Sequence, residues 1–381
     1  MINPLTSLES KDISERVFLV RIDTNVSVEN GEVTNDFRLR SVKDSLNFLL
    51  DRKAKVLLIG HREPSPEASL EAIADYYKKF FPTKFFPSCE PEKVRNQIDF
   101  LKGGEMLVLE NLRSLSHEKE NSKSFARALS SLADFYINDA FSVSHREHAS
   151  IVGVPRFLPS FSGFRFEREV KELSFAFLPE QPFVFILGGL KFKTKAPLIE
   201  KFLKKADLVF VGGALANSFF KERGWEIGVS AFDDSVDLSA VIDEENLLLP
   251  EDVTVETEAG ESKTVDSEKV SQKDNVVDLG PRSLEKLKEK ISSAKLVVWN
   301  GPMGNIEKGF TEYTHSLASQ IAESDCYSIV GGGDTVSSIS GLNLESDLSF
   351  ISTGGGAMLD FLVNESLPGI EALKKSPKIS F

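Results

Sequence analysis

The chain has 381 residues, 41% of them hydrophobic and 27% charged, which is typical of a globular protein large enough for two domains. Its net charge of −13 disfavours a nucleic acid or an anionic membrane as a partner. Cys89 and Cys326 have no metal-site spacing and predict no disulfide framework, and neither a signal peptide nor a membrane-spanning run is evident, so we expect a cytoplasmic protein.

Short β-branched and aromatic runs alternate along the chain with stretches of helical period. This alternation predicts mostly parallel sheets with helices on both faces, and such sheets bind ligands beyond the carboxyl ends of their strands. The predicted strands are 17–23, 55–61, 105–111, 134–139, 182–189, 206–213, 294–301, 326–333 and 348–355. The predicted helices include 38–52, 121–133, 194–205, 282–293 and 310–324.

In the first half of the chain, the predicted strands end in basic and amide side chains. Arginine and histidine gathered at one sheet edge would favour a small, strongly anionic ligand. The alternative is that each side chain is an ordinary solvated loop charge. The residues in question are Asp23, Asn25, Arg38, His61, Arg62, Asn111, Arg113, His145, Arg146 and His148.

In the second half, the predicted strands end in glycine instead. Bare backbone N–H groups at a helix start can surround phosphate oxygens, although glycine serves equally well in a tight strand-to-helix turn. The four clusters are "LGGLKF" (187–192), "FVGGAL" (210–215), "VGGGDT" (330–335) and "STGGGA" (352–357).

Three charged residues lie beside these glycines. Asp334 fits a magnesium ligand, since Mg²⁺ takes few carboxylates plus phosphate oxygens, or else it is the N-cap of the next helix. Lys191 and Lys195 flank a helix start and could meet one phosphate, or else they belong to a solvated first turn. Neither a P-loop nor a dinucleotide fingerprint occurs, which disfavours a P-loop enzyme and a dehydrogenase. The residues together suggest phosphoryl transfer between a nucleotide and a small phosphorylated acid.

Longer motifs carry a resemblance to a known family. "RIDTNVSVENGEVTNDFRLR", "LENLR", "NDAFSVSHREHASIVGV", "ILGGLKFKTK", "VVWNGPMG", "IVGGGDT" and "ISTGGGAMLDFL" occur in this order. The chain resembles phosphoglycerate kinase over roughly residues 14–374. The resemblance implies two Rossmann-like, three-layer α/β/α domains that face a central cleft. Residues 1–165, with a return segment at about 362–381, would bind 3-phosphoglycerate; 166–178 would form a connecting helix; and 179–361 would bind the nucleotide.

The resemblance also implies roles for individual residues. Arg38, Lys191, Lys195 and Gly355 would be catalytic, and Asp334 would hold Mg²⁺. The 3-phosphoglycerate site would comprise Asp23, Asn25, Arg38, His61, Arg62, Arg113 and Arg146. The ATP or ADP site would comprise Lys195, Gly212, Gly213, Asn300, Pro302, Glu307, Gly332, Gly333, Asp334, Thr335, Gly354, Gly355 and Gly356.

The activity implied is reversible Mg²⁺-dependent transfer between ATP and the carboxylate of 3-phosphoglycerate, a step of glycolysis that gives 1,3-bisphosphoglycerate and ADP. The acceptor carboxylate is already ionised at neutral pH, so no general base is required. Because the ligands would bind to separate domains, we expect a hinge closure. The resemblance implies a cytoplasmic monomer with small-molecule partners, and neither nucleic acid nor membrane.

The stretch "HREPSPE" (61–67) departs from the family pattern. The family has an arginine three residues after the histidine, whereas here Arg62 directly follows His61. Either Arg62 takes over part of the phosphate contact or one charge-assisted hydrogen bond, worth about 1.5–3 kcal/mol, is lost. Two alternatives therefore stay open: a non-catalytic nucleotide-binding paralogue, and an acyl-phosphate kinase with another small carboxylate acceptor.

Overall fold

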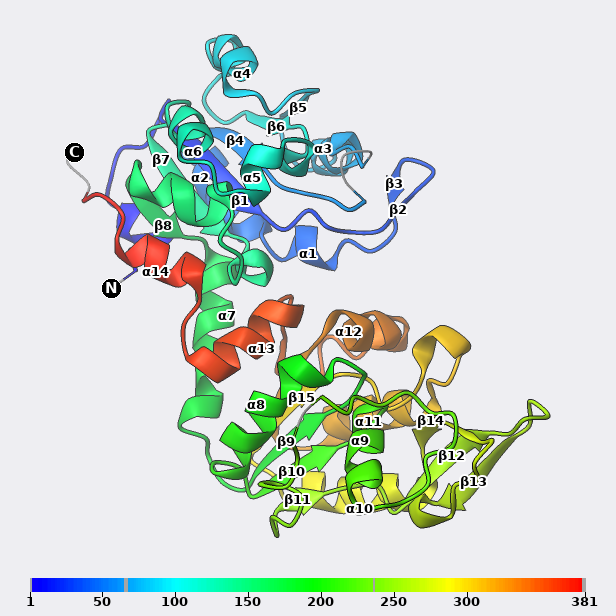
Figure 1. The fold of residues 1–381 in the computed structure, drawn as a ribbon. Helices are drawn as coiled ribbons and strands as arrows, with labels where there is room; N and C mark the ends of the chain where they lie inside the picture. The colour runs from blue at the N-terminus through cyan, green and yellow to red at the C-terminus, as the bar shows by residue number, and fades with distance from the viewer. Residues whose placement is uncertain (1, 65–67, 236, 379–381) are drawn as a thin grey trace. The chain divides into compact units, whose positions relative to one another are not determined.

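The structure is a computed structural model that describes residues 2–64, 68–235 and 237–378. The chain divides into two compact units, which are treated separately below (Figure 1). Apart from the residues outside the described ranges, unit 1 comprises Met1–Lys171 and Ser366–Phe381, and unit 2 comprises Glu172–Glu365. Within the described ranges, no helix has the length and apolar character needed to cross a membrane.

Unit 1 is built on a six-stranded parallel sheet in the order β5-β6-β4-β1-β7-β8. Its strands are β1 (Val17–Ile22), β4 (Lys55–Ile59), β5 (Thr83–Phe86), β6 (Met106–Leu109), β7 (Phe135–Asp139) and β8 (Ser160–Ser162). A small hairpin pairs β2 (Val28–Glu29) with β3 (Glu32–Val33). The helices are α1 (Phe37–Arg40), α2 (Lys43–Asp51), α3 (Glu71–Lys78), α4 (Pro91–Ile98), α5 (Ser116–Lys119), α6 (Lys123–Ser130), α7 (Phe164–Ser174) and α14 (Pro368–Lys374).

Unit 2 contains a second six-stranded parallel sheet, in the order β11-β10-β9-β15-β16-β17, and an antiparallel sheet in the order β13-β12-β14. The parallel strands are β9 (Phe183–Leu187), β10 (Leu208–Val211), β11 (Leu247–Leu248), β15 (Leu296–Asn300), β16 (Tyr327–Gly331) and β17 (Phe350–Ile351). The antiparallel strands are β12 (Asp252–Glu256), β13 (Ser262–Asp266) and β14 (Asn275–Leu279). The helices are α8 (Phe192–Leu203), α9 (Leu215–Glu222), α10 (Pro281–Ser292), α11 (Glu312–Glu323), α12 (Gly333–Ile339) and α13 (Gly355–Asn364).

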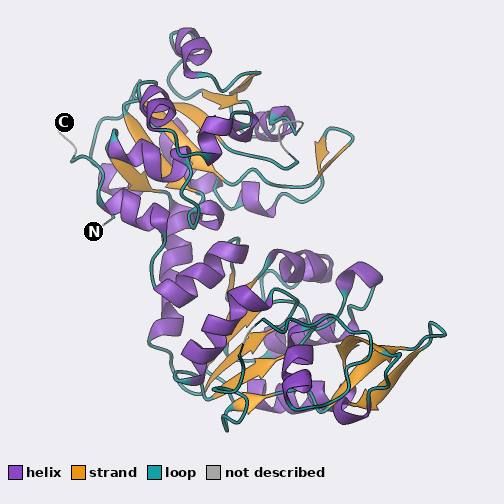
Figure 2. Ribbon diagram, viewed as in Figure 1, coloured by secondary structure: helices purple, strands orange, loops and turns teal. Residues whose placement is uncertain are grey.

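The central strands are buried along their whole length. All five residues of β7, of β9 and of β15 are buried, and helices flank both parallel sheets (Figure 2). A strand that is covered on both faces is mostly apolar on both faces, which explains the continuous rather than alternating apolar runs in the sequence. Asn138 and Asp139, the last two residues of β7, are buried polar exceptions. The helices bury one face only; in α6, for example, Phe125 and Leu129 face the core.

The predicted α/β architecture with mostly parallel sheets is confirmed, and several details differ. Residues 38–52 form α1 and α2 rather than one helix; the Ser41 hydroxyl donates to the Arg38 carbonyl at 2.8 Å, an interaction that competes with helix continuation. In the run 348–355 only Phe350 and Ile351 form a strand, and just before it the Ser349 N–H donates to the Ser328 hydroxyl at 2.9 Å. The antiparallel sheet, the β2–β3 hairpin and strands β5, β8 and β11 were not predicted.

The segment that leads from unit 1 into unit 2 is helical. Helix α7 is followed by a 3-10 turn at Phe175–Phe177, and the boundary between the units falls within α7. After α13 the chain rejoins unit 1, where the Gly369 N–H donates to the Ser144 carbonyl at 2.8 Å. Which ligand belongs to which unit stays a prediction.

Candidate functional site

The predicted anion-site residues of unit 1 follow neighbouring strands. Strands β6, β4, β1 and β7 are adjacent and parallel, so their carboxyl ends meet at one edge of the sheet. Asp23 follows β1, His61 follows β4 and Arg113 follows β6; all three are buried. They are therefore not solvated loop charges, whose side chains would lie in water.

Asp23 and Arg38 form the part of this edge that follows β1. The Arg38 guanidinium lies 3.1 Å from the Asp23 carboxylate and donates to the Asn25 carbonyl at 2.9 Å. Asp23 also accepts from the Asn25 N–H at 2.9 Å and from the Ser142 hydroxyl. These bonds fix a partly exposed guanidinium above the sheet edge, where it can face a ligand.

His61 is held in one neutral form by a buried arginine. Burial, and then the Arg21 charge, lower the pKa of His61 well below its usual range. The Arg21 guanidinium is fully buried and lies 3.0 Å from His61 Nδ1. Since a guanidinium can only donate, Nδ1 is the acceptor and the imidazole proton is on Nε2. His61 therefore offers a neutral N–H donor.

A buried network orients Arg21 in turn. Arg21 Nε donates to the Ser150 hydroxyl at 3.1 Å, and that hydroxyl donates to the Glu118 carboxylate at 2.5 Å. Glu118 also accepts from the Ser150 N–H at 2.9 Å. Glu118 is fully buried, so its charge offsets the charge of Arg21 inside the unit.

Cations are in excess around Arg113. The Arg113 side chain is only 3% exposed, and its Nε and Nη2 have no hydrogen-bond partner within the part of the chain that the structure describes. Burial lowers the pKa of Arg146, with Arg113 as the next cause, and burial with Arg113 and Arg146 lowers that of His148 to about 4. Unpartnered buried donors among neighbouring cations indicate an anion site.

Arg62 and Asn111 form hydrogen bonds within the loop "HREPSPE" and with the residues around it. The Asn111 amide donates to the carbonyls of Arg62 (2.7 Å) and Ala68 (2.8 Å). The Arg62 guanidinium donates to two backbone carbonyls, those of Val26 at 3.3 Å and Ser69 at 3.4 Å. A role of Arg62 in ligand binding stays a prediction, and residues 65–67 of "HREPSPE" lie outside the described residues.

In unit 2, Lys191 and Lys195 lie at the start of α8, as predicted. Lys191 is the N-cap residue and is exposed, whereas Lys195 is buried and donates to the Gly188 carbonyl. Burial, and then the Lys191 charge, lower the pKa of Lys195 to about 8, while Asp334 acts in the opposite direction. Lys195 is thus not part of a solvated turn, and its ammonium lacks a full counter-charge.

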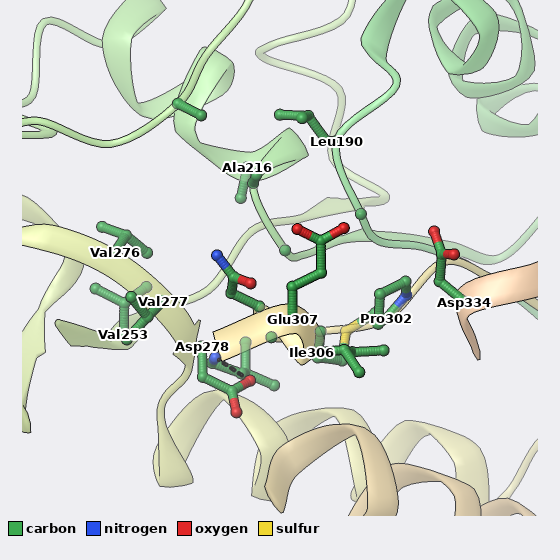
Figure 3. Close-up of a pocket in the computed structure, with 18 of the residues that line it drawn as sticks. Leu190, Ala216, Val253, Val276, Val277, Asp278, Pro302, Ile306, Glu307 and Asp334 are labelled. Carbon is green, nitrogen blue, oxygen red and sulfur yellow. Dashed lines mark hydrogen bonds between the residues drawn. The ribbon is translucent and has the colours of Figure 1, made fainter. Parts of the chain in front are cut away.

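A cavity of 340 Å³ opens at the carboxyl end of the unit 2 sheet (Figure 3). Gly213, Pro302, Glu307 and Asp334, all predicted nucleotide-site residues, line it. In Figure 3 the carboxylates of Glu307 and Asp334 are directed to one side and that of Asp278 to the opposite side. Apolar side chains complete the wall: Val253, Val276, Val277, Leu279 and Ile306. An apolar slot with a few polar groups suits a small organic ligand such as the predicted nucleoside.

The residues of "VGGGDT" start helix α12. Gly332 is the N-cap and Asp334 is the second helical residue, so the alternative prediction of Asp334 as N-cap was wrong. Asp334 is exposed at the cavity, while Thr335 is buried and accepts from the Gly301 N–H at 3.0 Å. Asn300 is buried too, with its amide 3.6 Å from Met358 Sδ. Asn300 and Thr335 do not line the cavity.

The triple glycine of "STGGGA" begins α13. Gly354 is the N-cap, and its N–H donates to the Ser352 hydroxyl at 3.0 Å. Gly355 has φ +38°, and a Cβ built there would meet nothing within 4 Å. The glycine therefore serves the backbone conformation and the open space at the helix start rather than close packing, which fits a phosphate-facing turn.

Gly213, unlike Gly355, is a glycine because neighbouring atoms leave no space for a Cβ. Its φ is +61°, and a Cβ there would lie 2.5 Å from the Gly189 nitrogen and 2.8 Å from the Pro302 carbonyl oxygen. We expect Gly213→Ala to lower stability by at least about 1–3 kcal/mol, because strained backbone and a backbone clash add. A urea unfolding curve checks this.

The matched control is Gly224→Ala. Gly224 has φ +76° with nothing within 4 Å of a built Cβ, so only the conformational cost applies there. Equal losses for the two variants would contradict the clash.

Sequence reasoning missed several residues of these sites. Arg21 lies within an apolar run that predicts a strand. A charged residue inside such a run was the one feature of the sequence that could have indicated its role. Glu118 and Ser150 carry no local signal, since their contacts are long-range.

Several glycines predicted for the nucleotide site do not line the cavity. Gly212 is buried behind it, where a Cβ would lie 2.8 Å from Met303 Sδ, and Gly332, Gly333, Gly354 and Gly356 do not line it either.

Known proteins match the chain over nearly its whole length. The family profile described as "Phosphoglycerate kinase" matches residues 8–365. The phosphoglycerate kinases of Dictyoglomus turgidum and Chelativorans sp. are each 37% identical, covering 97% and 96% of this chain and 98% of each relative.

Two solved structures agree with this. Phosphoglycerate kinase from Pyrococcus horikoshii superimposes with a TM-score of 0.86 at 29% identity, and that from Coxiella burnetii with 0.81 at 30%. Each covers 98% of this chain, and 99% of each solved chain is covered. With the whole length, the two-unit α/β fold and the motifs in agreement, the chain belongs to the phosphoglycerate kinase family.

Proposed function

We propose that this chain is an active phosphoglycerate kinase that transfers a phosphoryl group reversibly between ATP and the carboxylate of 3-phosphoglycerate. The observation that carries the proposal is the pairing of two different anion sites in one chain. In unit 1, Arg113 Nε and Nη2 are buried donors without a partner among the residues that the structure describes. Unit 2 has a buried lysine beside an apolar cavity and two glycine-rich helix starts. A simple nucleotide-binding protein has no use for the first of these sites.

In unit 1, different residues would bind different groups of the acceptor, 3-phosphoglycerate. Arg113 and Arg146 would bind the phosphate of 3-phosphoglycerate, since Arg113 has two buried donors without a partner among the described residues and lies close enough to Arg146 to lower its pKa. Asp23 would accept a hydrogen bond from the hydroxyl group of 3-phosphoglycerate, and Asn25 would donate one to the same group. His61, neutral with its proton on Nε2, would donate to the carboxylate end together with Arg38.

In unit 2, the cavity would take the nucleoside and the helix starts its phosphates. Glu307 carries a carboxylate that can accept from ribose hydroxyls. Lys195, Lys191 and the N-terminus of α13 at Gly355 would contact the phosphates. We also propose a cytoplasmic location, which the cysteine content favours, and a monomeric state, which the family resemblance implies.

Asp334 fits the Mg²⁺ that the family uses with its nucleotide. Its carboxylate is exposed at the cavity, and the described residues offer no cluster of three or more acidic, histidine or cysteine ligands. Mg²⁺ that accompanies a nucleotide needs only one or two carboxylates, since phosphate oxygens and water complete its shell. When bound, the ion would neutralise phosphate charge.

Phosphoryl transfer then depends on positioning and charge. The acceptor carboxylate attacks directly, so these residues need not remove a proton. Arg38 on one unit, with Lys191, Lys195 and the Gly355 N–H on the other, would stabilise the transferring group as its charge spreads over three oxygens. The two bound ligands must come into contact for the transfer to occur.

The pKa of Lys195 predicts a pH dependence. Only the protonated form attracts phosphate oxygens, and its pKa of about 8 lies well below the ordinary lysine value of 10.5. ADP affinity should therefore be constant below about pH 8 and fall as the pH rises above it, approaching tenfold per unit. Calorimetric titration between pH 6.5 and 9.5 measures this, and Lys195→Met should lose the alkaline decline.

The acceptor is tested by comparing 3-phosphoglycerate with glycerate, which lacks only the phosphate. ATP-dependent acyl phosphate, trapped with hydroxylamine, should form with 3-phosphoglycerate. Its formation should be at least about 100-fold less efficient with glycerate, because glycerate brings no phosphate to the buried Arg113. Equal efficiency would favour the kinase with another small carboxylate acceptor.

A further inference from the structure

The loop that departs from the family pattern places a carboxylate on the predicted phosphate site. Glu63, the third residue of "HREPSPE", forms an ion pair with Arg113 through Oε1 and Nη1. Its backbone N–H donates to the Asn25 side chain at 3.0 Å, which ties this part of the loop to the edge of the sheet. The contact joins residues 50 apart in sequence.

We propose that Glu63 is an internal competitor for the substrate's phosphate and so sets the affinity of this site for anions. The proposal rests on the function proposed above. The carboxylate occupies one donor atom of Arg113 and leaves Nε and Nη2 of the same guanidinium without a partner among the residues that the structure describes. A carboxylate that satisfied Arg113 fully would bind it in bidentate fashion.

Charge explains why the loop can release Arg113. Glu63 supplies negative charge to a cluster in which Arg113 and Arg146 otherwise repel each other, as its effect on the pKa of Arg146 shows. A phosphate dianion supplies more charge and three oxygens, and can reach the donors that Glu63 leaves unused. The exchange of a carboxylate for a phosphate therefore favours the phosphate, at an affinity reduced by the competition.

The displaced carboxylate has a second cation within reach. Lys119 Nζ lies 4.0 Å from Glu63 Oε1, and its side chain is 52% exposed. Glu63 is itself 40% exposed, whereas Arg113 is 3% exposed. Glu63 can therefore pair with Lys119 in water after a ligand takes Arg113, so the buried guanidinium always has one anionic partner.

The test is calorimetric titration of the full chain and its Glu63→Gln variant with two probes, inorganic phosphate and 3-phosphoglycerate. Removing the competitor should tighten the binding of both about tenfold, a change that corresponds to about 1.4 kcal/mol. The KM for 3-phosphoglycerate should fall similarly with kcat unchanged, because Glu63 has left Arg113 in the bound complex.

Three further variants test whether a gain in affinity comes from the contact between Glu63 and Arg113. Glu120→Gln makes the same charge change at an exposed side chain that pairs with His117 at 3.6 Å, and should leave both affinities unchanged. Glu63→Asp keeps the charge but shortens its reach, and should give an intermediate affinity. In an Arg113→Gln background, Glu63→Gln should bring no gain, since the competed group is absent.

The outcomes separate the two proposals. Tighter phosphate binding by Glu63→Gln without turnover of 3-phosphoglycerate would support the role of Glu63 and refute the proposed function. Turnover with the same KM in both proteins would keep the function and overturn the role of Glu63. Weaker binding by the variant, or an equal gain in Glu120→Gln, would also overturn it.

Discussion

Lys195→Met should lower kcat about 100- to 1000-fold without lowering thermal stability. The loss is that expected when a preorganised donor to a developing negative charge is removed from a water-poor site. Stability should hold because Lys195 is a buried cation whose pKa, lowered to about 8, shows that the fold disfavours its charge. An apolar side chain of similar length removes that cost.

Lys193→Met is the matched control. Lys193 lies on the same helix, α8, two residues earlier and exposed to solvent, so the same chemical change there should leave kcat unaltered. Steady-state kinetics and a thermal melt of both variants decide the matter. If Lys195→Met kept wild-type kcat, or unfolded at clearly lower temperature, the lysine would have a structural role instead.

Arg38→Ala should also cost about 100- to 1000-fold in kcat, through the acceptor side. Arg38 is partly exposed, and its guanidinium is held in place by an ion pair with Asp23 at 3.1 Å and a hydrogen bond to the Asn25 carbonyl at 2.9 Å. Asp23 keeps its bonds from Asn25 and Ser142 in the variant, so the sheet edge should persist. Steady-state kinetics with varied 3-phosphoglycerate separates an effect on kcat from one on KM.

Two companion variants test whether geometry or charge matters. Arg38→Lys keeps the charge but not the planar fork and should recover only part of the activity. Arg40→Ala, at an exposed residue of the same helix that lies 3.9 Å from Asp36, should behave as wild type. Equal activity of Arg38→Ala and Arg40→Ala would remove Arg38 from the proposed mechanism.

Much of the fold and of the site arrangement could be predicted from sequence, for a physical reason. Parallel strands buried on both faces are mostly apolar, so most of their ends are marked by a change to polar residues or glycine. Asp23, His61 and Arg113 were found in this way, and so were Lys191 and Lys195. Because parallel strands share one carboxyl edge, strand order was not needed to expect these residues together.

The remainder depends on contacts that no local pattern encodes. The bonds of Ser150 to Arg21 and Glu118 span 129 and 32 residues, and Glu63 reaches Arg113 across 50. Most of the apolar wall of the cavity comes from β12 and β14, whose valines are indistinguishable in sequence from core residues. The loss of the family's arginine was visible in "HREP", but the carboxylate on Arg113 was not.

The central claim is that this chain phosphorylates the carboxylate of 3-phosphoglycerate. The most direct measurement follows 1,3-bisphosphoglycerate formed by the purified wild-type protein from ATP, Mg²⁺ and 3-phosphoglycerate, with a coupled dehydrogenase as readout. We predict saturable formation in both substrates that stops when EDTA removes Mg²⁺. Absence of product from a folded protein that still binds ATP would contradict the claim and leave a nucleotide-binding paralogue.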